Sequence, residues 1–206
     1  MAERKHGLPA PETVSTVHTE DWDQGVGERD RHERVAFVGL DLCEATLRNV
    51  EFSDCTFRNA RFNCAELADV AFVNCTFTTG NFFDATFADC KLTGSMFDRC
   101  TFELMTVTGG DWSFVGMPGA DLSRASFTGV RMREADLTGV RYRNGTLRDV
   151  DLSAAWLHGA DLTGCDLRGS DLSALDPAVT EVRQALISAS QAVVVAMALG
   201  MRVVED

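Results

Sequence analysis

The sequence lacks several features that would mark the common functional classes of protein. It has 19 basic residues against 31 acidic ones in 206 residues, a net charge of −12. This shortage of positive charge disfavours direct binding to nucleic acid or to an anionic membrane and suits a basic partner. The longest apolar run, Ala192–Met201, is too short to cross a bilayer. The first residues, MAERKHGLPAPETV, lack the apolar segment of a secretion signal, so we expect a cytoplasmic protein.

Motifs for catalysis and for cofactor binding are also absent from the sequence. It contains no Ser/His/Asp arrangement, no Cys/His metal spacing and no phosphate-binding loop. Three of the four histidines lie within residues 1–34, and the fourth is His158. We therefore expect no enzyme activity, no catalytic or metal-binding residues and no cofactor.

What the sequence does contain is a repeat: every fifth residue from Phe37 to Leu172 is apolar or aromatic. With 45% of the chain hydrophobic, chance would give 28 such positions in phase on the order of once in 10¹⁰ trials, so this is an internal repeat. Within each five-residue unit, we call the position of the bulky residue position 0 and number the other positions relative to it. Position −2 is small or apolar throughout, as in Val50, Cys55 and Ala60, and positions −1, +1 and +2 carry nearly all the charge.

A period of five fits neither an amphipathic helix nor a flat strand. A unit that points one bulky and one small residue inward must turn a corner before it repeats, so four units would close a square coil of twenty residues. Stacked coils can then pair at the strand spacing of roughly 4.8 Å. We call the four sides the first, second, third and fourth faces. Their first bulky residues are Phe37, Leu42, Leu47 and Phe52, respectively, and each face continues at every twentieth residue. Their bulky residues fill the centre and leave no space for a cofactor.

The units ADLTG (135–139 and 160–164), CDLRG (165–169) and SDLSA (170–174) resemble the repeat of pentapeptide-repeat proteins. The resemblance implies an all-β fold, a right-handed quadrilateral β-helix. We expect this β-helix over residues 35–187. Residues 1–34 are predicted to be a partly disordered extension, with Trp22 as an end cap, while Gly27 and His32 fit the five-residue phase poorly. Glu103–Gly119 is the least regular stretch, and we expect a kink or a wider coil there.

The C-terminal segment, residues 188–206, departs from the repeat. Pro177, Val182 and Ile187 still hold the phase, and Ser190–Leu199 is predicted to be a short helix with Ser188 or Ser190 as N-cap and Gly200 as C-cap. Met201–Val204 could add a terminal strand. The helix is apolar on every side, so one side can cover the end of the coils and the other requires a second chain. We predict a homodimer whose interface contains Val193, Val194, Met197, Ala198 and Met201.

Cysteine is present in an odd number, seven, which argues against a full disulfide framework. Five of the cysteines occupy position −2, where we expect buried, reduced thiols that act as small apolar fillers: Cys55, Cys75, Cys90, Cys100 and Cys165.

Acidic residues outnumber basic ones on the predicted outer walls, with 19 against 12 over residues 35–174. By face the net charges are 0, −2, −2 and −3. A rod of seven coils would be about 34 Å long, and duplex DNA of that length carries about 20 charges. Mimicry of duplex shape is therefore plausible, and mimicry of its full charge density is not. The predicted acidic partner surface consists of Asp111, Glu134, Asp136, Asp149, Asp151, Asp161, Asp166 and Asp171.

The unbroken rod, the Asp176-Pro177 coil and the terminal helix with Gln191 and Ala192 resemble the MfpA/Qnr branch of the family. The resemblance implies a dimer joined through the C-terminal helices. It also implies a DNA-mimicking protein that binds DNA gyrase or a related type II topoisomerase, inhibiting the enzyme or protecting it from fluoroquinolone drugs. The alternative is a general interaction scaffold whose unidentified protein partner contacts an outward apolar pair, Phe83 and Leu104.

Overall fold

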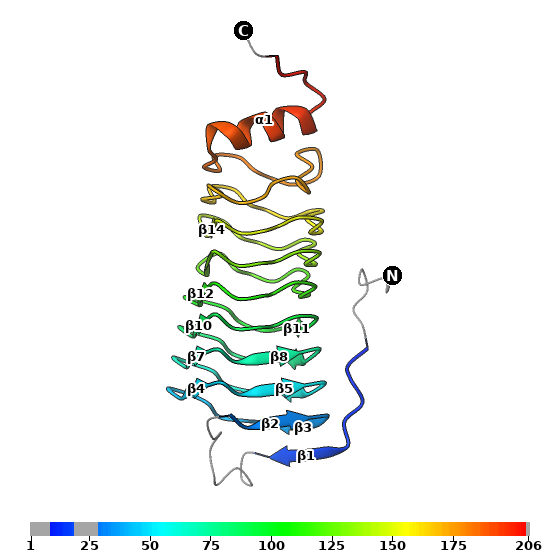
Figure 1. The fold of residues 1–206 in the computed structure, drawn as a ribbon, viewed down its shortest axis with the longest axis vertical. Coiled ribbons are helices and arrows are strands. Elements are labelled where there is room, and N and C mark those ends of the chain that lie inside the picture. The colour runs from blue at the N-terminus through cyan, green and yellow to red at the C-terminus, as the bar shows by residue number, and fades with distance from the viewer. Residues whose placement is uncertain (1–8, 19–28, 205–206) are drawn as a thin grey trace.

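A computed structural model describes residues 9–18 and 29–204 of the chain. Residues from Val35 onward form an upright column of stacked coils, with a helix across its C-terminal end (Figure 1). Each coil takes twenty residues, because Phe37 pairs with Phe57 and Phe57 with Phe77 in parallel registers. The architecture is the predicted β-helix.

The described strands are short, and each lies on one face of the column. Their bounds are β1 Ser15–His18, β2 Arg31–Glu33, β3 Val35–Val38, β4 Thr46–Arg48, β5 Glu51–Ser53, β6 Thr56–Arg58, β7 Glu66–Ala68, β8 Ala71–Val73, β9 Thr76–Thr78, β10 Thr86–Ala88, β11 Met96–Asp98, β12 Thr106–Thr108, β13 Ser126–Thr128 and β14 Thr146–Arg148. The first face holds the sheet β1-β3-β6-β9-β11, the third β14-β13-β12-β10-β7-β4 and the fourth β2-β5-β8. Isolated parallel bridges, such as Asp121 with Arg141, join the coils on the second face.

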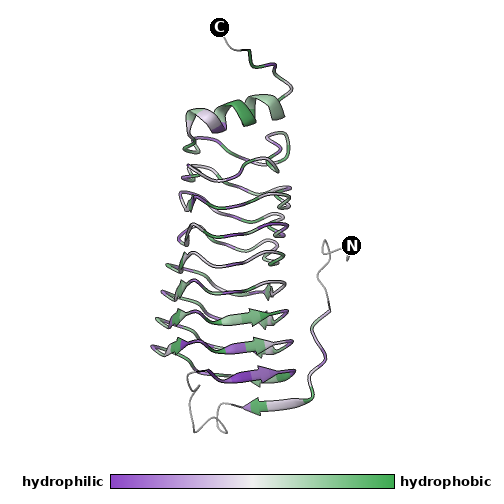
Figure 2. Cartoon of the chain, viewed as in Figure 1, coloured by the Kyte–Doolittle hydropathy of each residue, from purple (hydrophilic) through white to green (hydrophobic). Residues whose placement is uncertain are grey.

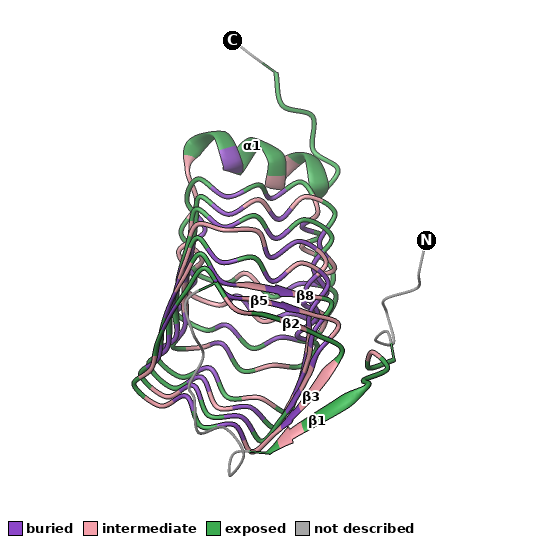
Figure 3. Cartoon of the chain, turned by 60° about the horizontal axis from the view of Figure 1, so that its bottom comes forward, coloured by how far each residue is buried: buried purple, intermediate pink, exposed green. Residues whose placement is uncertain are grey.

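The bulky residues of the repeat fill the centre of the column. All 28 predicted positions from Phe37 to Leu172 are buried. Stacked phenylalanines follow the coil spacing, with ring centroids 4.9 Å apart for Phe37 and Phe57 and 4.8 Å apart for Phe57 and Phe77. Seen partly end-on, short buried stretches recur along the coils of the column (Figure 3). Burial of each large side chain contributes roughly 1.5–3 kcal/mol, which explains how such short strands hold together.

The small inward position also serves the backbone. Where it is Ser, Thr or Cys, the side chain donates to a carbonyl of the coil below, as Ser170 Oγ does to Leu147 O at 2.7 Å and Cys75 Sγ to Phe52 O at 3.4 Å. All seven cysteines are free. Of the five expected to be buried, Cys100 is only half-buried and the other four are buried. Burial raises the pKa of Cys90 and Cys100 to about 11, so these thiols stay protonated.

The N-terminal residues add strands below Val35. Strand β1 pairs with β3, and β2 pairs with β5. The prediction that His32 fits the repeat poorly is wrong, because His32 pairs with Phe52 and its ring stacks on that phenylalanine at 5.1 Å. Trp22 and Gly27 lie outside the described residues.

The segment before β1 runs back along the column (Figure 1). Val14 N–H donates to Arg34 O at 2.7 Å, and Pro9 and Pro11 line a shallow cavity with Asn74, Gly94 and Met96. This segment therefore lies against the edge between the fourth and first faces.

The expected kink or wider coil at Glu103–Gly119 is not present. Gly116 bridges to Met96 on one side and to Asp136 on the other, so the twenty-residue register continues through this stretch. A Cβ at Gly116 would lie 2.1 Å from Met96 Cε, the mobile end of a side chain on the neighbouring coil. The irregular composition of this stretch therefore does not change the path of the chain.

The C-terminal helix, α1 (Ala189–Ala198), begins one residue earlier than predicted and ends one residue earlier. Ser188 is the N-cap and forms a capping box with Gln191. Leu199 is the C-cap, and Gly200 follows it at φ +81°. Residues Met201–Val204 form no strand.

The helix closes the end of the column mainly through one polar side chain. Gln191, which is 7% exposed, places Nε2 2.7 Å from the carbonyl oxygens of both Leu167 and Ser170. Its amide thereby satisfies backbone acceptors that no further coil covers. Val182, Ala185, Ile187 and Val195 pack against the core beside it. Most of the helix is hydrophobic along its length (Figure 2), and its outer side is exposed.

Candidate partner-binding surface

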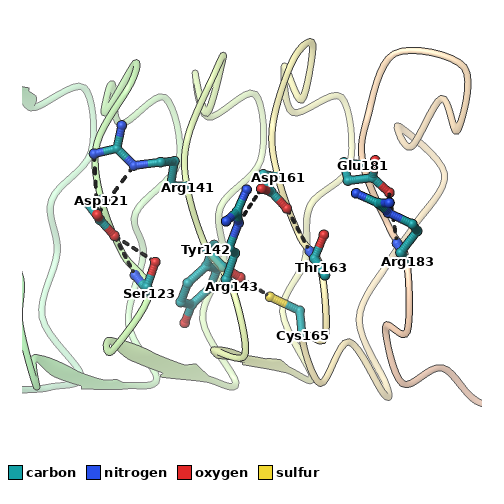
Figure 4. A network of polar contacts seen from close by, with 10 residues as sticks. All are labelled: Asp121, Ser123, Arg141, Tyr142, Arg143, Asp161, Thr163, Cys165, Glu181 and Arg183. Atoms are coloured by element: carbon teal, nitrogen blue, oxygen red, sulfur yellow. Dashed lines mark hydrogen bonds and ion pairs between the residues drawn. The ribbon is translucent and has the colours of Figure 1, made fainter.

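With a filled centre, the column can meet other molecules only through its outer walls and its ends. On the second face, position −1 forms a vertical row in which the sign of the charge alternates over several coils: Asp41, Arg61, Asn81, Thr101, Asp121, Arg141, Asp161 and Glu181. Arg61 is ion-paired with Asp41, and Arg141 lies 3.3 Å from Asp121 (Figure 4). Neighbouring coils therefore neutralise one another along this row.

The fourth face repeats this arrangement in part. Its row at position −1 contains Arg31 beside Glu51, at 3.3 Å, and Arg131 beside Asp111, at 3.4 Å. Exposed pairs of this kind contribute little to stability, roughly 0–1 kcal/mol each, but they cancel much of the surface charge.

An acidic residue at position −1 also has a local task. Its carboxylate accepts the backbone N–H of position +1, as in Asp121 with Ser123 at 3.1 Å and Asp161 with Thr163 at 3.1 Å (Figure 4). Such bonds hold the tight turn of the unit. Hydrogen bonds from Cys43 and Arg61 lower the pKa of Asp41 to about 2. These carboxylates remain charged at neutral pH while bound to their own chain.

The predicted acidic surface divides accordingly. Asp136 does not belong to it, because that residue is only 2% exposed. Asp111, Asp161 and Asp166 are ion-paired. Asp161 pairs with Arg143, and Asp166 pairs with both Arg148 and Arg168. Asp151 accepts hydrogen bonds from the N–H and Oγ of Ser153.

Three of the eight predicted carboxylates are exposed and have no ion-pair partner among the described residues: Glu134, Asp149 and Asp171. Asp171 and Glu134 belong to the fourth face, and Asp149 lies at the corner where the third face meets it. We call these three residues the acidic edge. Arg133 is close to it in sequence and reduces its net charge. The structure thus leaves a smaller set of exposed carboxylates without ion pairs than the sequence predicted, and Glu134 lies at the corner where the fourth face meets the first.

The apolar pair lies outward as expected. Phe83 and Leu104 are each 37% exposed and belong to neighbouring coils, since Asp84 N–H donates to Glu103 O at 2.9 Å. Leu104 has a left-handed backbone with φ +62°. An open cavity of about 310 Å³ lies nearby, lined among others by Cys100, Glu103 and Arg124.

The residues predicted for the dimer interface all lie on the exposed part of the C-terminal segment: Val193, Val194, Met197, Ala198 and Met201. Leu186 and Leu199 add to this apolar surface at 51% and 54% exposure. A helix in which Gln191 and Val195 face the column leaves these side chains in water. Apolar surface gathered in this way favours association.

Sequence reasoning missed the alternation of charge and the turn-forming role of the aspartates. A spacing of twenty residues at position −1 carries the signal for the alternation, and an aspartate two residues before the turn N–H carries the signal for the second role. Within residues 9–18 and 29–204, no three His, Cys, Asp or Glu side chains are placed to hold a metal ion. The described helix is also too short for a bilayer span.

Comparisons with known families agree with this architecture. The model for pentapeptide repeats matches residues 117–141 and 147–176, and the model for the SV2A/B/C luminal domain matches residues 27–107. The chain therefore carries pentapeptide repeats and has the β-helix fold that such repeats form. No curated protein sequence matches it significantly.

Among solved structures, the fold is similar to that of QnrB1, which is described as a plasmid-mediated fluoroquinolone resistance protein. One trypsin-treated variant of QnrB1 gives a TM-score of 0.57 at 21% identity, covering 93% of this chain and 95% of that one. A second trypsin-treated variant gives 0.55 at 20% identity over 95% and 100%. The full-length protein gives 0.52 at 20% identity over 92% and 99%. The chain thus carries pentapeptide repeats and has a fold similar to that of QnrB1.

Proposed function

We propose that this protein binds DNA gyrase or a related type II topoisomerase at the site that normally holds a DNA segment. Binding inhibits the enzyme and protects it from fluoroquinolone-type poisons. The observation that carries the proposal is the end-to-end similarity to QnrB1, which covers more than nine-tenths of both chains. A rod without an internal pocket acts through its outer shape, and shape is what this similarity describes.

The charge pattern sharpens the proposed contact. Ion pairs neutralise much of the second face, so that face is a poor substitute for a row of phosphates. The acidic edge of Glu134, Asp149 and Asp171 keeps its charge free for basic groups of the partner. We therefore place the electrostatic contact at the fourth face of the C-terminal half, and mimicry rests more on the width of the column than on charge density.

A homodimer completes the proposal. Pairing of two α1 helices through Val193, Val194 and Met197 would cover the exposed apolar surface and join two columns end to end. Val194→Glu should then give monomers in size-exclusion chromatography with light scattering, because it introduces a charge into the contact. Ala192→Glu is the control, since Ala192 is exposed on the same helix but outside the predicted interface. A dimer that persists in Val194→Glu would contradict this mode of pairing.

The function is tested by a gyrase supercoiling assay with the purified, folded protein. We expect inhibition at low salt that weakens as salt screens the contact. The triple variant Glu134→Gln, Asp149→Asn, Asp171→Asn should inhibit at least about tenfold less well, which corresponds to roughly 1.4 kcal/mol. A fluoroquinolone added to the same assay should then cause less DNA cleavage in the presence of the wild-type protein.

The matched control removes the same charge elsewhere. Asp54, Asp69 and Asp84 all have left-handed backbones, which asparagine adopts readily, and they lie in the N-terminal half. Their triple Asn variant should inhibit like the wild type. Equal loss in both triple variants would show a general charge effect, and no inhibition by the wild-type protein at any concentration would refute the proposal.

The alternative, a general interaction scaffold, has one specific observation in its favour, the exposed Phe83 and Leu104 on neighbouring coils. It predicts that Phe83→Ser with Leu104→Asn abolishes capture of a partner other than a topoisomerase subunit. Under the gyrase proposal, the same double variant retains inhibition of supercoiling.

A further inference from the structure

The stacking of coils opens between the coil that contains Trp156 and the coil that follows it. Between the coil that contains Trp156 and the coil before it, the backbone hydrogen bonds are complete on this face. Leu137 N–H donates to Trp156 O at 2.9 Å, and Gly139 N–H donates to His158 O at 2.9 Å. The corresponding bond from Leu157 to Asp176 is absent, and Gly159 N–H donates instead to Val179 O at 2.7 Å. The register has therefore slipped by one residue at this corner.

The cause is a helical turn at Asp176. The carbonyl oxygen of Asp176 accepts the N–H groups of Val179 and Thr180, at 3.1 and 3.0 Å, and is no longer directed at the coil below. Pro177 has no N–H and a fixed φ that suits the start of such a turn. Thr180 Oγ1 still donates to Leu157 O at 3.0 Å, so the inner wall stays closed while the outer wall bulges.

The bulge leaves a cavity of about 510 Å³ on the first face. It is lined by Thr138, Trp156, Leu157, His158, Ala174, Asp176, Val179 and Thr180. Trp156 and Val179 supply aromatic and aliphatic surface, and Asp176 is the charged residue of the lining. The Oδ1 atom of Asp176 accepts Ala178 N–H at 2.9 Å, so the carboxylate is held in place.

The electrostatics of the cavity favour a cation. Its lining contains no Lys or Arg, in contrast to the second face, where arginines neutralise the acids. Asp136 bridges to Trp156 from the coil below, is 2% exposed, and its Oδ2 atom has no hydrogen-bond partner among the described residues. One aspartate side chain therefore lies on the coil below Trp156, and a second one lines the cavity together with Trp156. A cation over an indole ring gains further attraction, and a guanidinium does so most often because it is planar.

We propose that this cavity is a binding site for an arginine side chain of a protein partner, with the guanidinium stacked on Trp156 and paired with Asp176. The volume accommodates a complete arginine side chain. The site does not depend on a topoisomerase as the partner, because its lining on the first face includes no residue of the acidic edge.

The test uses N-acetyl-arginine methylamide as the probe and its citrulline analogue, which has the same shape and no charge, as the comparison. Binding is followed by NMR through the indole N–H signal of Trp156, assigned with Trp156→Phe. We expect a saturable shift with the arginine compound and binding at least about tenfold weaker with citrulline. An equal response to both compounds, or no shift with arginine, would overturn the proposal.

Two substitutions locate the charge. Asp176→Asn keeps the oxygen that accepts Ala178 N–H and removes the negative charge, so we expect arginine binding to weaken about tenfold. Asp171→Asn is the matched control in the same coil, where the aspartate accepts Ser173 N–H at 2.8 Å on the fourth face. Arginine binding that is unchanged in Asp176→Asn, or reduced equally in Asp171→Asn, would show that the cavity does not recognise the cation.

Discussion

The N-terminal half of the column, residues 35–100, is filled mainly by phenylalanine, and the C-terminal half, residues 101–175, mainly by leucine. The outer corners differ too. Asn and Asp often occupy the left-handed position +2 in the first half, as at Asn49, Asp54 and Asn59, whereas glycine is common there in the second. Strands also give way to isolated bridges along the column.

These differences show two ways to hold the same coil. In the N-terminal half, stacked rings and strand pairing supply the cohesion. In the C-terminal half, an aspartate at position −1 fastens the turn from outside, as Asp151 does with Ser153 N–H at 3.0 Å, and a glycine completes the corner. Aspartate is therefore abundant in the C-terminal half for a structural reason, and its abundance there is a poor measure of an acidic binding surface.

The largest effect is expected where the rings are densest. Phe77 is within ring-contact distance of five other phenylalanines: Phe57, Phe62, Phe72, Phe82 and Phe97. Phe77→Asp should unfold or aggregate the protein, because losing the ring costs about 3–5 kcal/mol and a buried unpaired charge adds several more. Thr78→Asp, on the outward side, should be nearly neutral. Circular dichroism during thermal melting measures both, and similar behaviour would contradict the inward assignment.

Two glycines of the C-terminal half that have left-handed backbones give the next effect. Gly110, at the small inward position −2, has φ +82°, and a Cβ there would lie 2.1 Å from the carbonyl oxygen of Cys90. Gly119 has φ +68° with nothing within 4 Å. Gly119→Ala should cost about 1–2 kcal/mol for its backbone conformation alone. Gly110→Ala should cost about 1–3 kcal/mol more because the backbone must move. Denaturant unfolding compares the two, and equal losses would mean that contact between coils does not limit the residue at position 110.

The sequence predicts the path of the chain well, because a single five-residue period specifies what is inside and what is outside. It predicts the packing and exposure of a single residue poorly where these depend on side chains of the neighbouring coils. His32 looked out of phase by its polarity, yet its ring stacks on Phe52. Glu103–Gly119 looked irregular by its composition, yet Gly116 bridges in register to Met96 and to Asp136. The exposure of Asp136 could not be inferred from its own unit, since its burial depends on the coils on either side.

A smaller effect is expected in how local stability depends on pH, which should differ between the two ends of the column. Burial lowers the pKa of His32, although Asp30 partly opposes the shift. The unfolded chain then binds the proton more readily, so stability is complete above the unfolded value of about 6.5 and falls as pH drops below it. Opening free energies from hydrogen exchange should decrease for β2 and β5 between pH 7.5 and 5.5, and not for β13 and β14. His32→Phe should remove this difference. A uniform decrease along the column would assign the effect to other groups.

The smallest expected effect distinguishes the two kinds of aspartate within the C-terminal half. Hydrogen bonds from Arg168 lower the pKa of Asp166 to about 2, whereas Asp171 is exposed and has no ion pair among the described residues. Asp166→Asn should lower the melting temperature slightly more than Asp171→Asn, because it alone breaks an ion pair. In gyrase inhibition the order should reverse, since only Asp171 offers free charge to a partner. If Asp166→Asn reduced both the melting temperature and the inhibition more than Asp171→Asn did, ion pairing within the column would not determine which carboxylates are available to a partner.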